Sequence, residues 1–268
     1  MNQEKLYLWE KGKVPHFNPE YKQEEPSLTP YLLNNGKKNG CVIVCPGGGY
    51  SMKSPHECGP IAEKINAYGV SAMTLDYRVA PYQYPAITED VLRAVRYVRY
   101  HADELNVDPE KIAVLGFSAG GHLANSALCV FDYGRDDGDA IDRVSSRPDA
   151  VILCYAVISL SKYSHTHTRQ NLIAGLPNEN ELQNRLSGEL AVKEDTPPCF
   201  LWHTAADSCV AVQNSLQLYN ALCEKKILSE LHVFPYGDHG LGLAEDNPNV
   251  RQWSALLGNW LDLMGFRK

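Results

Sequence analysis

Short apolar runs alternate along this chain with segments in which apolar residues recur every three or four positions. The runs predict buried strands, and they lie at residues 41–45, 70–77, 112–115, 150–155, 199–203 and 231–234. The segments between them predict helices at about 60–68, 88–105, 121–129 and 249–264. Strands that alternate with helices favour an α/β fold, a mostly parallel central sheet flanked by helices.

Two segments interrupt this alternation. Residues 1–35 are polar and punctuated by prolines, which predicts an arm or an edge hairpin. Residues 160–196 are polar and rich in loop-forming residues, which predicts a small lid-like insertion over the carboxyl edge of the sheet, where such folds bind ligands. We therefore expect residues 1–268 to form a single domain with a modest lid.

The segment 111–124 carries the clearest chemical motif. A predicted strand is followed by Gly116-Phe117-Ser118-Ala119-Gly120 and then by a predicted helix, the order of a nucleophile elbow. The serine of an elbow lies on a strained turn, and glycine two residues before and after it avoids a collision between strand and helix. The motif alone could also be a glycine-rich turn with a surface serine.

A serine nucleophile needs a base, and the base needs an acid to orient it. The chain offers Asp207 directly after one predicted strand and His239 directly after the last one, in the order serine, acid, histidine. Parallel strands bring their carboxyl ends to the same edge, so we expect Ser118, Asp207 and His239 to form a catalytic triad.

Each partner has an alternative. Asp207 could cap the helix that begins near Val212, and His239 could be an ordinary loop histidine. His203 is a competing base, but it precedes the acid, and Asp238 is a competing acid whose side chain should diverge from that of its neighbour.

Three consecutive glycines follow the strand at 41–45, in the segment Pro46-Gly47-Gly48-Gly49-Tyr50. Glycines allow the backbone to approach a substrate closely and to aim amides at a developing negative oxygen. We therefore expect the amides of Gly48, Gly49 and Ala119 to form the oxyanion hole; the alternative is a mere turn between strand and helix.

Composition narrows the class of partner. The net charge of −7 and the isoelectric point near 5.7 argue against nucleic acid and anionic membranes. Residues 1–13 carry charges throughout and do not resemble a signal peptide, and the longest apolar run, at 150–158, is about half of a membrane span. We expect a cytoplasmic protein whose partner is a small molecule.

No cofactor or metal is expected. The sequence contains no nucleotide-binding glycine motif, and the pair His165 and His167, which could hold a metal, has no evident third ligand. The eight cysteines show no C-x-x-C pair and lie mostly in apolar surroundings, which predicts buried free thiols.

With these motifs in place, the sequence resembles the α/β-hydrolase carboxylesterases of the hormone-sensitive-lipase-like group, and within it the acetyl-esterase or xylan-esterase-like proteins. The resemblance covers most of the chain after residue 40. It is carried by VIVCPGGGYS (42–51), LDYRVAP (75–81), YPAITEDVLRAVRYVR (84–99), DPEKIAVLGFSAGGHLA (108–124), PPCFLWHTAADSCV (197–210) and HVFPYGDHGLGLA (232–244).

The resemblance implies an esterase that removes short acyl groups, plausibly acetyl groups from xylose-type sugars or their oligosaccharides. Pro46 departs from the histidine that is usual in the lipase-like group, and Ala206 stands where a second acid is frequent. Tyr50 and His122 flank the oxyanion loop and the elbow, and they are candidates either for lining the pocket or for packed structure.

Two other functions remain open at this point. The same triad could serve an amide-directed hydrolase, such as a formamidase or a small peptidase, or the fold could bind a small ligand without catalysis. The sequence leaves the oligomeric state open, a homo-oligomer included.

Overall fold

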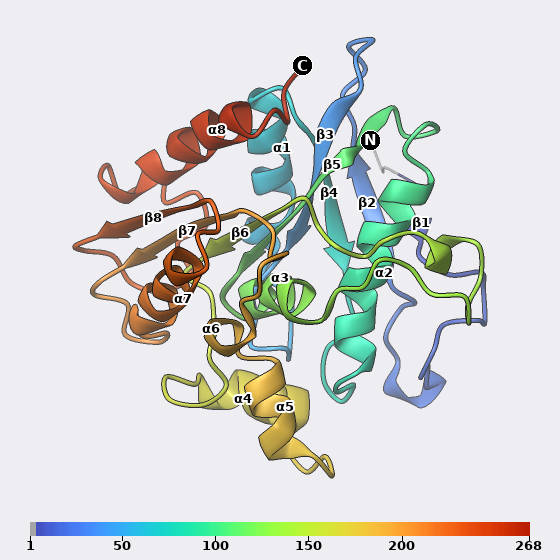
Figure 1. Cartoon of the computed structure of the whole chain (residues 1–268), viewed down its shortest axis with the longest axis horizontal. Helices are drawn as coiled ribbons and strands as arrows, with labels where there is room; N and C mark the ends of the chain where they lie inside the picture. Colours follow the sequence, from blue (N-terminus) through green and yellow to red (C-terminus); the bar gives the residue numbers. More distant parts are fainter. Residues whose placement is uncertain (1–3) are drawn as a thin grey trace.

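The computed structural model describes residues 4–268, and its centre is a sheet of eight strands in the order β1-β2-β4-β3-β5-β6-β7-β8 (Figure 1). β1 and β2 pair antiparallel, as do β2 and β4, and every later neighbour pairs in parallel. The strands are Leu6–Tyr7, Ser27–Tyr31, Asn39–Cys45, Ser71–Asp76, Val107–Phe117, Ala150–Cys154, Cys199–Thr204 and Ser229–Phe234. This mostly parallel sheet confirms the predicted fold class.

Helices cover both faces of the sheet. α1 and α8 lie on one side of the sheet, and α2, α3 and α7 lie on the other (Figure 1). The buried side chains of each group of helices form a separate core cluster with those of the sheet face that they cover. The helices are α1 Gly59–Ala67, α2 Ala86–Tyr100, α3 Ser118–Val130, α4 Thr166–Ile173, α5 Glu179–Arg185, α6 Gly188–Ala191, α7 Gln213–Glu224 and α8 Trp253–Leu263. Between residues 4 and 268, no helix is long and apolar enough to cross a membrane.

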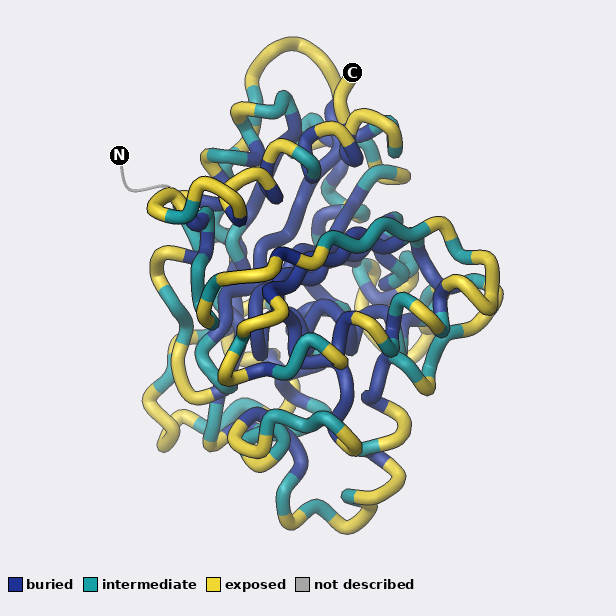
Figure 2. Tube along the Cα trace, turned by 90° about the vertical axis from the view of Figure 1, so that its left-hand side faces the viewer, coloured by how far each residue is buried: buried dark blue, intermediate teal, exposed yellow. Residues whose placement is uncertain are grey.

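Coverage of both faces explains the continuous apolar runs. Every residue of β3 is buried; the side chain of Ile43 belongs to the core cluster on one face of the sheet, and those of Val42 and Val44 belong to the cluster on the other. Figure 2 shows buried residues gathered in the centre of the molecule and exposed residues around it. A strand that is covered on only one face would alternate apolar and polar residues instead.

The two irregular segments take separate places. The N-terminal segment supplies β1 and β2, an antiparallel edge beside β4. The insertion carries the short helices α4, α5 and α6, which lie together beyond the end of the sheet (Figure 1).

The helix expected at 88–105 is shorter in the structure. α2 ends at Tyr100, and a turn follows in which Leu105 donates to the His101 carbonyl and Asn106 adopts a positive φ of 53°. Ala102 remains buried within this turn, so the apolar spacing continues beyond the helix that it predicts.

A fully buried ion pair joins the segment after β4 to α2. Asp90 accepts hydrogen bonds from the backbone amide, Nε and Nη2 of Arg78, at 2.7–3.1 Å. The same guanidinium donates to the carbonyls of Pro15 and Ala86, so one side chain also anchors the N-terminal segment.

We expect Asp90→Ala to lower the free energy of unfolding by about 3–5 kcal/mol, because it leaves the Arg78 charge buried without its counter-ion. Urea unfolding of the variant beside the wild type measures this loss. The double variant Arg78→Met/Asp90→Leu, which removes both charges, should be more stable than Asp90→Ala. A loss below about 1 kcal/mol in the single variant would contradict the interpretation.

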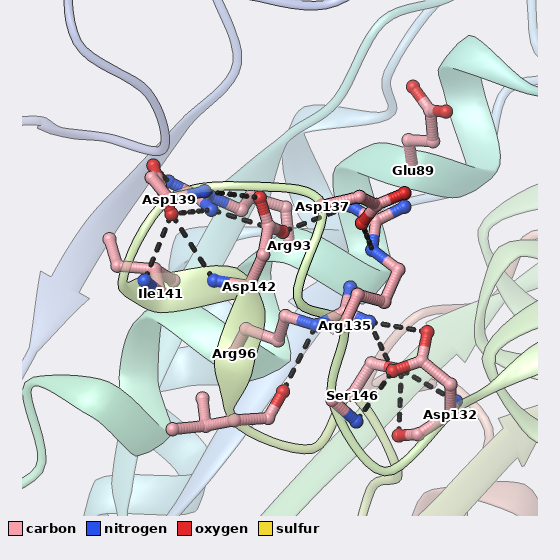
Figure 3. A network of polar contacts seen from close by, with 12 residues as sticks. Glu89, Arg93, Arg96, Asp132, Arg135, Asp137, Asp139, Ile141, Asp142 and Ser146 are labelled. Carbon is pink, nitrogen blue, oxygen red and sulfur yellow. Dashed lines mark hydrogen bonds and ion pairs between the residues drawn. The ribbon is translucent and has the colours of Figure 1, made fainter.

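Another polar network fastens the loop at 131–143 to α2 (Figure 3). Arg93 pairs with Asp139 and Asp142, and Arg96 pairs with Asp132. The network borders a cavity of about 420 Å³. Because both arginines of α2 are buried and already bonded to carboxylates, we interpret this cluster as structural.

Candidate active site

The elbow around Ser118 is a sharp turn between β5 and α3. Ser118 has a φ of 53°, which a residue with a side chain adopts only under strain. A Cβ atom on Gly116 would lie 2.1 Å from the Gly120 carbonyl oxygen, and one on Gly120 would lie 2.2 Å from that of Cys45. Glycine at 116 therefore allows β5 to turn sharply into α3, and glycine at 120 allows α3 to approach the end of β3.

Ser118, His239 and Asp207 meet at the carboxyl ends of parallel strands. The Nε2 atom of His239 lies 2.8 Å from the Ser118 Oγ, and its Nδ1 atom lies 2.8 Å from the Asp207 Oδ2. Asp207 follows β7, and His239 follows β8, the neighbouring strand. The structure thus brings together the three side chains that the sequence singled out.

The hydrogen bonds fix the tautomer of His239. The carboxylate of Asp207 only accepts, so the proton of the neutral imidazole is assigned to Nδ1. Nε2 is then free to accept from the Ser118 hydroxyl. This polarity is the one that proton transfer from serine to histidine requires.

Asp207 is held as a carboxylate by several donors. Its Oδ1 accepts from the amides of Cys209 and Val210 at 2.9 and 2.8 Å, and its Oδ2 also lies 3.4 Å from His203 Nε2. Burial alone would raise the pKa of this carboxyl. The bonds from His203, His239 and Val210 instead hold the pKa well below its usual range.

The competing residues have other partners. The Nε2 of His203 donates to the Val210 carbonyl, and its Nδ1 lies 2.8 Å from the Ser215 Oγ, so His203 supports the acid from behind. Asp238 accepts from the amide of His239 and from the hydroxyl of Ser208, not from the imidazole.

Backbone hydrogen bonds orient the amides of the glycine loop. The Gly47 carbonyl accepts from the amide of Ser54, and the Gly48 carbonyl accepts from that of Met52. In a trans peptide the N–H points opposite to the C=O, so the amides of Gly48 and Gly49 point away from these bonds.

These amides remain available as donors. Among the hydrogen bonds of residues 4–268, neither Gly48 nor Gly49 donates from its backbone, and both residues line one pocket with Ser118. Ala119 lies in the first turn of α3, where an amide has no partner within the helix. Gly48 has a φ of +130°, and a Cβ on it would lie 2.2 Å from the Met52 carbonyl oxygen, so this position requires glycine.

A buried carboxylate links this loop to the histidine loop. Glu57, only 2% exposed, accepts from the Gly47 amide at 2.7 Å and from the Tyr155 hydroxyl at 2.5 Å. That hydroxyl accepts in turn from the Gly242 amide at 2.9 Å, and the Tyr155 ring packs edge-on against the His239 ring, 5.0 Å between centroids. Sequence reasoning missed both residues, because nothing in the pattern around Glu57 distinguishes it from a surface glutamate.

Tyr50 and His122 do not line the pocket, which corrects one of the two interpretations given for them. Both are fully buried, and the Tyr50 hydroxyl lies 2.9 Å from His122 Nδ1. The opposite ring nitrogen donates to the Leu186 carbonyl, and burial lowers the pKa of His122 to about 4, so the imidazole is neutral. The pair joins the glycine loop to α3 and to the end of α5.

The pocket above Ser118 has a volume of about 240 Å³. His165 and His167 line it, together with Cys209, an exposed thiol that corrects the expectation of buried cysteines; Cys223 is exposed as well. Within the described residues 4–268, no group of three or more histidine, cysteine or acidic side chains is arranged to hold a metal ion.

Comparison with known proteins agrees with this architecture. A family model described as BD-FAE matches residues 30–222. The chain is 41% identical over 227 residues to endo-1,4-beta-xylanase B of Butyrivibrio fibrisolvens, and 31% identical over 235 residues to an acetylxylan esterase of Xylanibacter ruminicola. These matches cover 82% and 86% of the chain but only 35% and 47% of the relatives, so the chain spans less than half of their length.

A crystal structure of an acetyl ester-xyloside bifunctional hydrolase from Caldicellulosiruptor lactoaceticus matches the whole chain. The TM-score is 0.96 at 43% identity, over 100% of this chain and 98% of the other. An esterase from Thermogutta terrifontis with bound propionate matches with a TM-score of 0.79 at 26% identity, over 99% and 96% of the two chains. The predicted resemblance to α/β-hydrolase esterases is thereby confirmed.

Proposed function

Because the chain belongs to the BD-FAE family and has the α/β-hydrolase fold, we propose that it is a serine carboxylesterase that removes acetyl groups from acetylated xylose-type sugars. The observation that carries the proposal is the hydrogen-bonded chain from Ser118 through His239 to Asp207, beside backbone amides that have no acceptor among residues 4–268. The printed names of two relatives, an acetylxylan esterase and an acetyl ester-xyloside hydrolase, support the choice of substrate.

In the proposed reaction, Nε2 of His239 takes the proton of Ser118 while Oγ attacks the acyl carbonyl. The carbonyl oxygen becomes negative, and the amides of Gly48, Gly49 and Ala119 stabilise it. The imidazolium, stabilised by Asp207, then gives its proton to the departing alcohol oxygen.

The acyl group is left as an ester on Ser118. A water molecule attacks this ester while His239 removes one of its protons, and a second tetrahedral intermediate forms in the same oxyanion hole. Collapse of that intermediate returns the proton to Ser118 and releases the acid. Every proton in this reaction is taken up and released by Nε2 of His239. The tautomer fixed by Asp207 therefore suits both formation and hydrolysis of the acyl-enzyme.

The shape of the pocket supports a short acyl group. Its volume of about 240 Å³ has to hold the acyl group and the reacting atoms. Its lining is mostly apolar but small in extent, and Met52 is the one large aliphatic side chain among the residues that line it. A long alkyl chain would find little apolar surface to bury against, so lengthening it gains little binding free energy.

We expect kcat/KM for 4-nitrophenyl esters to be highest with acetate and to fall by about tenfold or more at octanoate, a difference of about 1.4 kcal/mol in transition-state stabilisation. Initial rates over the series acetate, butyrate, hexanoate and octanoate measure this. Equal rates across the series would contradict the acyl preference. Faster turnover of 4-nitroacetanilide than of 4-nitrophenyl acetate would replace the esterase with an amide hydrolase.

A further inference from the structure

We propose that the start of α4 supplies a sugar subsite: His165 and His167 donate hydrogen bonds to hydroxyl groups on the alcohol half of the ester. The inference rests on the proposed esterase function and adds which residues recognise the alcohol. Three kinds of observation carry it: the residues at the rim of the pocket, the tautomers of the two imidazoles, and the contact between α4 and the glycine loop.

In the bound ester, the alcohol half has to extend out of the pocket across its rim. An oligosaccharide does not fit within about 240 Å³, so only the acyl end can be enclosed. The pocket residues at the solvent side are Ser51, Met52, His167 and Cys209, which are exposed, and His165, which is half-buried. The alcohol therefore meets α4 and the glycine loop.

The tautomer of His165 is set by its own helix. As the N-cap of α4, its Nδ1 accepts from the amide of Thr168 at 3.4 Å, and it lies 2.8 Å from the Thr168 hydroxyl, which can also donate to it. Since the amide can only donate, the proton of the neutral ring is assigned to Nε2. Burial, with the nearby His239 and His167, lowers the pKa of His165 and favours this neutral form. Nε2 lies 3.5 Å from the Sγ of Cys209, and a thiol is a weak acceptor that a sugar hydroxyl can replace.

His167 is held by a neighbour on the same helix. The side-chain amide of Asn171 donates to His167 Nε2 at 3.1 Å and to the Gly49 carbonyl at 2.8 Å. The proton of the neutral His167 ring is therefore assigned to Nδ1, on the other side of the ring. Both imidazoles thus carry donors of fixed direction, and Met52 adds an apolar surface for the C–H face of a sugar ring.

The contact with Gly49 links the subsite to the reacting centre. The His167 ring packs so closely on Gly49 that a Cβ there would lie 2.7 Å from its Cδ2. A sugar held by α4 is thus positioned against the glycine loop, which lines the same pocket as Ser118. Recognition of the alcohol and placement of the acyl carbonyl become parts of one arrangement.

The test compares two acetates of six-membered rings, methyl β-D-xylopyranoside carrying one acetyl group and cyclohexyl acetate, which has no hydroxyl groups. The readout is the ratio of their kcat/KM values. His165→Asn should lower this ratio by about five- to tenfold, since one neutral hydrogen bond to the xyloside is lost. Asparagine is itself a good N-cap residue, so α4 keeps its start while the shorter side chain withdraws the donor.

Gln170→Ala is the matched control, because Gln170 is an exposed residue of α4 outside the pocket, and its ratio should equal that of the wild type. His165→Phe, which keeps a ring of similar size, should show the same loss as His165→Asn. An unchanged ratio in both His165 variants would overturn the subsite while leaving the esterase intact. Failure of the wild type on both acetates would instead overturn the proposed function itself.

Discussion

Ser118→Ala is expected to lower kcat for 4-nitrophenyl acetate by about 10,000-fold or more, to the level that the oxyanion amides and binding alone provide. In the proposed reaction the Ser118 Oγ accepts the acyl group, and it lies 2.8 Å from Nε2 of His239, to which it gives its proton. Without it neither the acyl-enzyme nor its hydrolysis is available, and KM should change far less than kcat.

The matched control is Ser126→Ala, which removes a hydroxyl from the same helix, two turns beyond the elbow. Ser126 bonds to the carbonyl of His122 and takes no part in the proposed chemistry, so its loss should leave kcat within a few-fold of the wild type. Labelling by a fluorophosphonate should occur in the wild type and in Ser126→Ala but not in Ser118→Ala. Retention of more than a tenth of the activity in Ser118→Ala would refute the assigned nucleophile.

Asp207→Asn is expected to lower kcat by about 1,000- to 10,000-fold. The Oδ1 atom accepts from the amides of Cys209 and Val210, and only an oxygen can occupy that position. The new amide group must therefore face His239 and donate to Nδ1, which forces the proton onto Nε2. The ring then cannot accept the proton of Ser118.

Asp238→Asn is the control for this variant, because Asp238 is the neighbour of His239 and its carboxylate bonds to backbone and serine instead of to the ring. Its activity should stay within a few-fold of the wild type. Comparable losses in the two variants would mean that the acid has been assigned to the wrong residue.

The same substitution should change how stability depends on pH. The pKa of Asp207 is lower in the folded chain than the value of about 3.9 in an unfolded one, so its ionised form stabilises the fold above about pH 4. This contribution is lost as the pH falls through the folded pKa. Asp207→Asn should be less stable than the wild type at pH 7, and urea unfolding should show the difference shrinking as the pH drops below about 4.

The sequence could predict what depends on local pattern and chain order. The elbow was predictable because its pattern, strand, G-x-S-x-G and helix, is local in sequence, and the steric limit on Gly116 comes from Gly120 within the same motif. Asp207 and His239 were predictable because parallel strands bring their carboxyl ends to one edge of the sheet. Two residues that each directly follow such a strand in sequence are therefore expected to lie near each other in space. The buried centres of the strands followed from burial on both faces, but their limits did not: β5 begins at Val107, five residues before the predicted strand, and that extension includes exposed residues.

What depended on contacts between distant residues was not predictable in this way. Glu57 and Tyr155 are 98 positions apart and meet only after the sheet has formed. Tyr50 and His122 flank the site in sequence, yet both side chains point into the core, where they form a hydrogen bond with each other. Closeness in sequence to a catalytic residue therefore does not tell whether a side chain points into the pocket or into the core.

The Glu57–Tyr155 pair also shapes how this site can change during evolution. Loss of Glu57 alone would leave the Gly47 amide and the Tyr155 hydroxyl without their shared acceptor, and loss of the Tyr155 hydroxyl would deprive Glu57 and the Gly242 amide of theirs. Both substitutions break the one hydrogen bond between the two residues, so their effects on stability should not add, and the two positions form an epistatic unit. We therefore expect the glycine loop and the histidine loop to change together, since a lineage that loses one of the two residues passes through a sequence in which a buried group is unpaired.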